Sequence, residues 1–132
     1  MIETRYLSHT KLWRLIGFTL LFSIVYLSLT STPVAMPNFK LADKLGHLLA
    51  YGLLMFWFGQ LYPSWSRQVR WFIGFCLMGV ILEVLQGLGG DRYFEYADML
   101  ANATGAALGW WLTRGWFAGT LYRFERLLFT SA

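Results

Sequence analysis

Residues 71–90 read WFIGFCLMGVILEVLQGLGG, and this stretch decides the fold class of the chain. Its apolar residues run on far longer than a strand would need, and Glu83 and Gln86 are polar exceptions near its end. An α-helix needs roughly 20 predominantly apolar residues to cross a bilayer core of ~30 Å. The stretch therefore predicts a membrane-spanning helix over residues 71–89, with the glycines at its end opening the next loop.

The rest of the chain is also rich in apolar residues. Of its 132 residues, 57% are hydrophobic and 14% are charged, and the mean hydropathy is +0.47. A soluble domain of this size leaves much of its surface in water and could not cover so many large apolar side chains. We therefore predict an all-α integral membrane four-helix bundle, a single domain over residues 1–132, with spans at about residues 12–30, 45–62, 71–89 and 99–117.

The first span could be mistaken for a secretory signal peptide, because Arg5, Lys11 and Arg14 precede its apolar run. The apolar run is long for a signal peptide, however, and Pro33 would stand at the minus-three position of the cleavage site. We expect this segment to be retained as a membrane helix.

Basic residues are divided unevenly between the connecting segments, and this predicts the direction of the helices. The N-terminal segment, the loop after the second span and the C-terminal segment together carry Arg5, Lys11, Arg14, Arg67, Arg70, Arg114, Arg123 and Arg126. The loops on the other side carry only Lys40, Lys44 and Arg92. Because cytoplasmic segments of membrane proteins are enriched in Lys and Arg, both termini are predicted to be cytoplasmic. The net charge of +4 follows from these topology signals, so we expect no nucleic-acid partner.

Two further patterns concern the C-terminus and helix contacts. Beyond the fourth span, apolar residues alternate with charged ones from residue 121 to 128, which predicts a short C-terminal amphipathic helix at the interface. Small residues recur at every fourth position in two spans: Ala42, Gly46 and Ala50, and Ala101, Gly105 and Gly109. Such stripes allow close helix contact. Packing within the chain is favoured over a contact between copies in a homo-oligomer.

Polar residues gather on the predicted outer side of the last three spans. They are Asp43, Lys44, His47, Tyr51, Glu83, Gln86, Asp91, Arg92, Glu95, Asp98 and Asn102. Asp43, His47 and Tyr51 are spaced four apart and share a helix face, with Lys44 on the neighbouring flank. An unpaired ionisable group at membrane depth costs about 2.5–3.5 kcal/mol or more, so Glu83 and His47 indicate a functional site.

Structural roles are the alternative for several of these residues. Ion pairs could simply hold the helices together, Asp98 could cap the fourth span, and Lys44 could reach toward lipid phosphates. Tyr51 is of the kind that packs in a core while bonding its hydroxyl. For Asp91 and Glu95, solvated charges are the favoured interpretation.

These residues resemble the pattern of the VanZ-like family. The matching segments are DKLGH at 43–47 with Tyr51, EVLQ at 83–86, DR at 91–92 and DMLANATG at 98–105. The resemblance implies a multi-pass protein of the bacterial cytoplasmic (inner) membrane, and a shared polar set of Asp43, Lys44, His47, Glu83, Gln86, Arg92, Asp98 and Asn102. The family name comes from a protein linked to teicoplanin resistance, a role that does not transfer to this chain.

The charge types predict a periplasm-facing pocket that binds or processes the head group of an envelope lipid or lipid-linked sugar. Lys44 and Arg92 suit a phosphate or carboxylate, and His47 suits proton transfer near neutral pH. The assigned roles are catalytic for His47, Glu83 and Asp98, and binding for Asp43, Lys44, Tyr51, Gln86, Arg92 and Asn102.

No cofactor is predicted. A metal held by His47 with Asp43, Glu83 or Asp98 is the remaining option, but a single histidine makes a poor zinc set. Catalysis and binding stay open as activities of the pocket. The alternatives are a small oligomeric transporter or proton- or solute-binding protein, and a non-catalytic accessory subunit of the membrane.

Overall fold

The computed structural model describes residues 6–30, 41–90 and 93–130. Within them it is all-α, as predicted. The helices are α1 (Thr10–Leu29), α2 (Ala42–Leu61), α3 (Trp65–Leu88), α4 (Tyr96–Arg114) and the short α5 (Thr120–Phe129). Each predicted span overlaps one of the four long helices, and α5 coincides with the predicted amphipathic helix.

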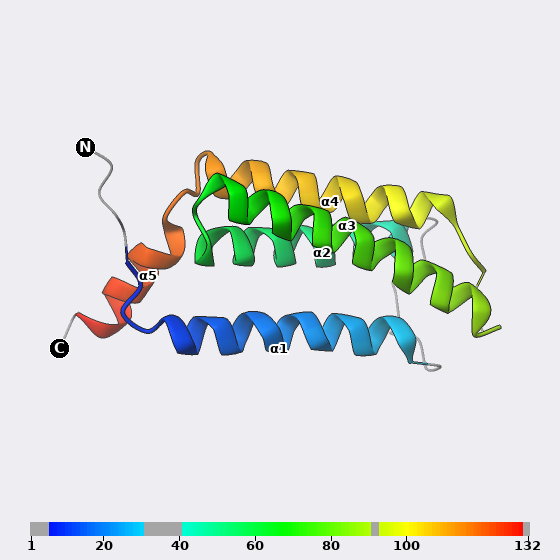
Figure 1. The fold of residues 1–132 in the computed structure, drawn as a ribbon, viewed down its shortest axis with the longest axis horizontal. Coiled ribbons are helices and arrows are strands. Elements are labelled where there is room, and N and C mark those ends of the chain that lie inside the picture. Colours follow the sequence, from blue (N-terminus) through cyan, green and yellow to red (C-terminus); the bar gives the residue numbers. More distant parts are fainter. Residues whose placement is uncertain (1–5, 31–40, 91–92, 131–132) are drawn as a thin grey trace.

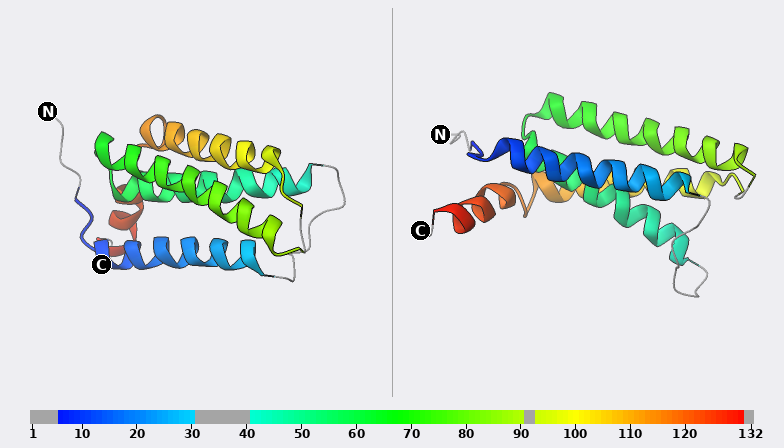
Figure 2. Two further views of the ribbon diagram at one scale, coloured as in Figure 1. Left: turned by 45° about the vertical axis from the view of Figure 1, so that its right-hand side comes forward. Right: turned by 90° about the horizontal axis from the view of Figure 1, so that it is seen from below.

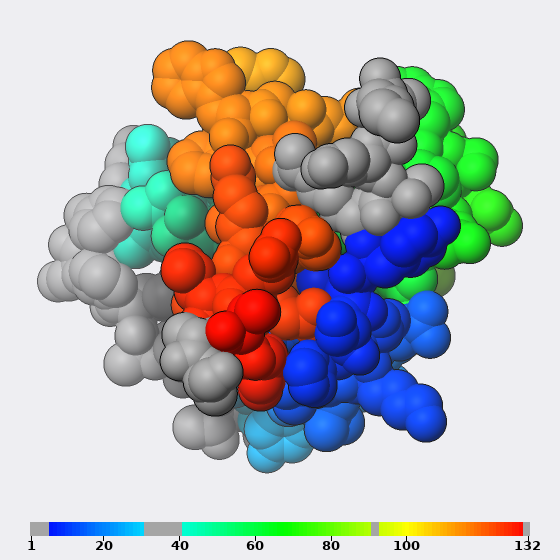
Figure 3. All heavy atoms as spheres, turned by 90° about the vertical axis from the view of Figure 1, so that its left-hand side faces the viewer, coloured from blue at the N-terminus to red at the C-terminus, as the bar shows by residue number. Residues whose placement is uncertain are grey.

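The four long helices run alternately in opposite directions (Figure 1). Helices α2, α3 and α4 lie together, and α1 lies along one side of this group (Figure 2). Helix α5 crosses one end of the bundle beside the start of α1 (Figure 3). At the other end α2 begins, α3 ends and α4 begins, and we call this the polar end because the predicted polar residues fall there (Figure 1).

Two local features set the direction of the chain between helices. Pro63 follows α2, and because a proline disfavours helical backbone in the residue before it, Tyr62 leaves the helix with φ −125° and ψ 78°. Gly119 precedes α5 with φ 74°, in the left-handed region that glycine reaches without a steric penalty. This glycine lets the chain turn from α4 into α5.

The contact between α2 and α4 is the closest in the bundle. A Cβ atom on Gly105 would lie 2.2 Å from the Leu48 carbonyl oxygen, and one on Gly109 would lie 2.2 Å from the Gly52 carbonyl oxygen. Backbones can approach this closely only where no side chain stands between them. The glycines of the predicted α4 stripe therefore serve packing within the chain, which was the favoured interpretation.

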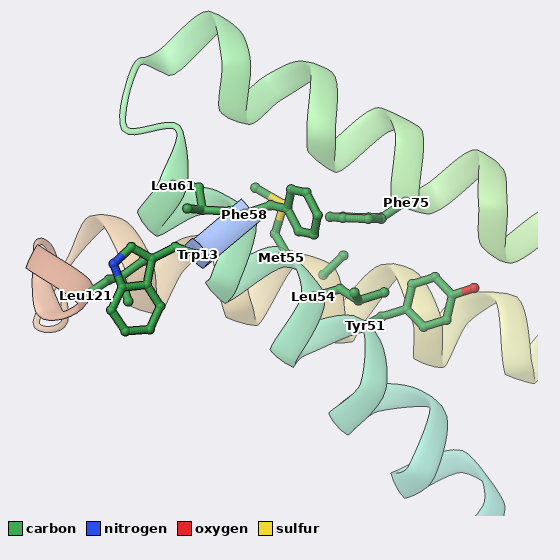
Figure 4. Packing of buried hydrophobic residues seen from close by; sticks show 9 residues of the cluster. Trp13, Tyr51, Leu54, Met55, Phe58, Leu61, Phe75 and Leu121 are labelled. Atoms are coloured by element: carbon green, nitrogen blue, oxygen red, sulfur yellow. The ribbon is translucent and has the colours of Figure 1, made fainter. Parts of the chain in front are cut away.

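An aromatic cluster joins α1 to the other helices. Phe58 of α2 is fully buried, and its ring centroid lies 5.4 Å from that of Phe18 on α1, and 4.2 Å and 5.5 Å from those of Trp71 and Phe75 on α3. The buried side chains continue along α2 from Tyr51 to Leu61 (Figure 4). Helix α2 is thus the central element, and every other long helix packs against it.

The outer faces of the long helices are apolar. Large side chains such as Leu15, Phe22 and Leu77 are mostly exposed. Among the described helices, α1 and α3 have the length and composition needed to cross a membrane. Helices α2 and α4 begin with the polar residues of the polar end, which lowers their apolar content.

A buried carboxylate ties α5 to the start of α1. Glu125 is only 3% exposed. Its Oε1 accepts a hydrogen bond from the Ser8 amide (2.6 Å), and its Oε2 accepts from the His9 amide (2.9 Å) and the Trp13 indole (2.5 Å). Burial favours the neutral acid, but the three donors outweigh it, so the pKa of Glu125 lies below its usual range. Its carboxylate thus satisfies amides that α1 leaves unpaired at its N-terminus.

The α2–α4 contact makes a first prediction. Gly105→Ala should lower stability by about 1–3 kcal/mol, because the added methyl meets backbone atoms that cannot turn aside. Gly74→Ala is the matched control, since a Cβ there has nothing within 4 Å, and alanine favours a helix interior by about 1 kcal/mol. Apparent melting temperatures of the detergent-solubilised protein measure both. Equal stability of the two variants would contradict the close contact.

A second prediction concerns Glu125. Because its folded pKa is lowered, its stabilising contribution is complete above the ordinary glutamate pKa and is lost as pH falls through the folded value. Glu125→Gln should cost about 1–3 kcal/mol at neutral pH. The glutamine side chain replaces one accepting oxygen with an NH₂ group, which would face N–H donors and leave them without an acceptor. The melting-temperature difference between wild type and variant should shrink as the pH is lowered below about 4.5. A difference that stays constant would show that Glu125 is not the titrating group.

Candidate functional site at the polar end

Lys44 lies at the centre of the ionic contacts of the polar end. Its ammonium forms ion pairs with Glu95, just before α4, and with Asp98 in the first turn of α4. It also lies 3.7 Å from Oδ2 of its neighbour Asp43. Lys44 thus connects the start of α2 to the start of α4, and its positive charge is shared among three carboxylates.

His47, one turn further along α2, lies between two acids and an amide. Its Nδ1 is 2.9 Å from Oδ1 of Asn102 on α4. Its Nε2 is 3.8 Å from Oδ1 of Asp43 and 3.8 Å from Oδ2 of Asp98. Because an amide oxygen only accepts, the proton belongs on Nδ1, and Nε2 is left facing the carboxylates.

Glu83 reaches the same region from α3 and is 1% exposed. Its Oε1 accepts a hydrogen bond from the Glu95 amide (2.9 Å), which holds the segment that leads into α4. Its Oε2 is buried and has no hydrogen-bond partner among residues 6–30, 41–90 and 93–130. A buried polar atom without a partner is costly, so this oxygen is a candidate contact for a ligand.

The structure brings together most of the sequence-predicted site. Residues from α2, α3 and α4 meet at the polar end: Asp43, Lys44, His47, Glu83, Asp98 and Asn102. Gln86 instead donates from Nε2 to the Ser28 carbonyl oxygen (2.7 Å) and ties α3 to the end of α1. Tyr51 is buried in the core cluster. Arg92, with Asp91, lies outside the described residues.

Two details of the polar end differ from the sequence interpretation. Asp98 does not cap α4, because the helix begins at Tyr96 with Glu95 in the N-cap position, and the Asp98 side chain pairs with Lys44 instead. Glu95 was favoured as a solvated charge, yet it pairs with Lys44 and its amide binds Glu83. Glu95 and Asp98 are three positions apart in the sequence, and this spacing could have predicted that their side chains lie close together.

Comparison with known proteins identifies the family of the chain. An all-α bundle with one polar end and apolar outer faces is the kind of fold expected of a small membrane protein. Residues 3–118 match the VanZ/LLP1 family, and the chain belongs to that family. Its membership places it among VanZ-like envelope proteins. Neither curated proteins nor solved structures give a significant match. The family resemblance stated from residues 43–109 is confirmed.

The ion pair between α2 and α4 makes a third prediction. Lys44→Met leaves the buried Asp98 carboxylate without its cation and should cost about 1–3 kcal/mol, less than for a fully buried pair because Lys44 is partly exposed. Lys44→Met combined with Asp98→Asn should recover part of this loss. Melting temperatures of the two single variants and the double variant form the measurement. Strictly additive losses would show that the pair makes no net contribution.

Proposed function

We propose that the chain spans a bacterial cytoplasmic membrane four times, with both termini cytoplasmic, and that its polar end faces the periplasm and binds or processes the head group of an envelope lipid or lipid-linked sugar. The single observation that carries the proposal is the meeting of His47, Glu83 and Asp98 from three different helices at one end of an apolar bundle. Intramembrane ionisable residues are expensive and usually functional.

The orientation is supported by the charges at the two ends. The α5 end includes the basic residues Lys11, Arg14, Arg67, Arg70, Arg114, Arg123 and Arg126. At the polar end Lys44 is outnumbered by carboxylates. The positive-inside rule then assigns the α5 end to the cytoplasm. Helices of 19 to 24 residues are about 28–36 Å long and fit a bilayer core.

The chemistry suits a polar head group that enters from the periplasm. The side chain of Asp43 is largely exposed, and those of His47, Asp98 and Glu83 are progressively more buried. A head group would therefore contact Asp43 first. His47 is placed to exchange a proton with a bound hydroxyl. Lys44 and Arg92 supply positive charge for a phosphate. Binding of the phosphate requires that Lys44 exchange its ion pair with Asp98 for one with the phosphate.

A fourth prediction tests this function. His47→Ala and Glu83→Gln should each leave the folded yield in detergent close to that of wild type, and should lower the amount of envelope lipid that copurifies by about tenfold, equal to about 1.4 kcal/mol. His9→Ala is the matched control, because His9 lies beside Glu125 at the α5 end. Size-exclusion profiles measure yield, and mass spectrometry measures bound and converted lipids.

The outcomes separate the competing functions. Normal yield with unchanged lipid content in both variants would contradict a head-group site. Loss of folded yield in both would favour a purely architectural cluster. Lipid that is bound by wild type but never converted, across a broad extract of envelope lipids, would favour binding over catalysis.

A further inference from the structure

Three side chains at the polar end have the arrangement of a cation site. One ligand atom each from Asp43, His47 and Asp98 lie within 4.8 Å of one another. Ligands about 2.0–2.2 Å from a tetrahedral metal ion lie roughly 3.5 Å apart. Side-chain shifts on the order of 1 Å would therefore close the three atoms around an ion. The exposed side chain of Asp43 leaves room for water to complete the coordination.

The hydrogen bonding of His47 is an independent observation that points to a cation. A metal-bound histidine usually donates its second ring N–H to a carboxylate or carbonyl oxygen, which fixes the ring and its tautomer. Asn102 Oδ1 stands 2.9 Å from Nδ1 and does this here. Nε2 then faces oxygens of Asp43 and Asp98. Two carboxylates beside this ring nitrogen favour a positive charge there, either a ring proton or a bound metal ion.

The charge balance of the polar end is a third observation. Glu83, buried with an unpartnered Oε2 within the described chain, interacts electrostatically with Asp98, His47 and Lys44, so it faces the same cluster. The sequence assigns eight charged residues to the predicted outer side of the membrane. The acids are Asp43, Glu83, Asp91, Glu95 and Asp98, and the bases are Lys40, Lys44 and Arg92. The acids exceed the bases even when every residue is counted. Such an excess at membrane depth favours binding of a cation.

We propose that Asp43, His47 and Asp98 bind a divalent cation, Mn²⁺ in preference to Zn²⁺, that Asn102 orients His47 for this purpose, and that Lys44 is an internal competitor for Asp98. One imidazole with two carboxylates suits Mn²⁺, whereas zinc sites usually contain more imidazole or thiolate ligands. Lys44 can release Asp98 and keep Glu95, with which it already pairs. The inference rests on ligand geometry. It shares His47, Asp98 and Lys44 with the proposed lipid site, but its test measures ion binding and not lipid binding.

The experiment is a titration of the purified full chain, without a histidine tag, with Mn²⁺ or Zn²⁺ alone, followed by Mn²⁺ EPR and by equilibrium dialysis. Wild type should bind one ion per chain. Asp43→Asn and His47→Gln should weaken binding by about tenfold or more, and Asn102→Ala by about 10–100-fold as an orienting residue. Asp43 is largely exposed, so its variant keeps the fold.

Lys44→Met provides the sharpest test because its predicted effect has the opposite sign. Removing the competing ammonium should tighten binding by about tenfold, and added Mn²⁺ should restore the melting temperature that this variant loses. His9→Ala is the control and should bind as wild type does. The proposal is overturned if no saturable binding occurs below about 1 mM, or if the Asp43 and His47 variants bind like wild type, which would mean an adventitious ion only. Weaker binding by Lys44→Met would overturn its role as a competitor.

Discussion

The contact of the α2 and α4 backbones is the constraint on which the rest of the structure depends. Gly105 and Gly109 allow carbonyl oxygens of Leu48 and Gly52 to come so close that a methyl group would not fit between the helices. This contact follows directly after His47 on α2 and begins three residues beyond Asn102 on α4, and it fixes the spacing of the two helices there. The 2.9 Å contact between His47 and Asn102 is a direct consequence, because both side chains are too short to bridge widely separated helices.

The helices were predictable from the sequence because each depends on local information. Long apolar runs set α1 and α3, and Pro63 sets the end of α2. The meeting of polar residues from α2, α3 and α4 was also predictable, since they lie at helix ends on one side of an alternating topology. Any chain with these spans in this order brings the start of α2 and the start of α4 to the same end.

The specific partners were not predictable, because they join residues far apart in the chain. Glu125 binds amides more than 110 positions away, and Lys44 pairs with Glu95 across 51 positions. The polarity of Gln86 does not predict whether its side chain binds a ligand or the Ser28 carbonyl oxygen, because its amide group can donate to either. The choice is made by helix rotation, and helix rotation follows from packing over the whole bundle.

The two buried glutamates, Glu125 and Glu83, differ in how completely their oxygens are hydrogen-bonded. Glu125 has donors on both oxygens, so the structure already accounts for its charge and it needs no ligand. Glu83 is at least as buried, yet only one of its oxygens has a donor in the described chain. Burial therefore does not separate the two carboxylates, whereas completeness of hydrogen bonding does. The incompletely satisfied carboxylate is the one that interacts with His47 and Asp98, and this is why we propose the site at the polar end and not at the α5 end.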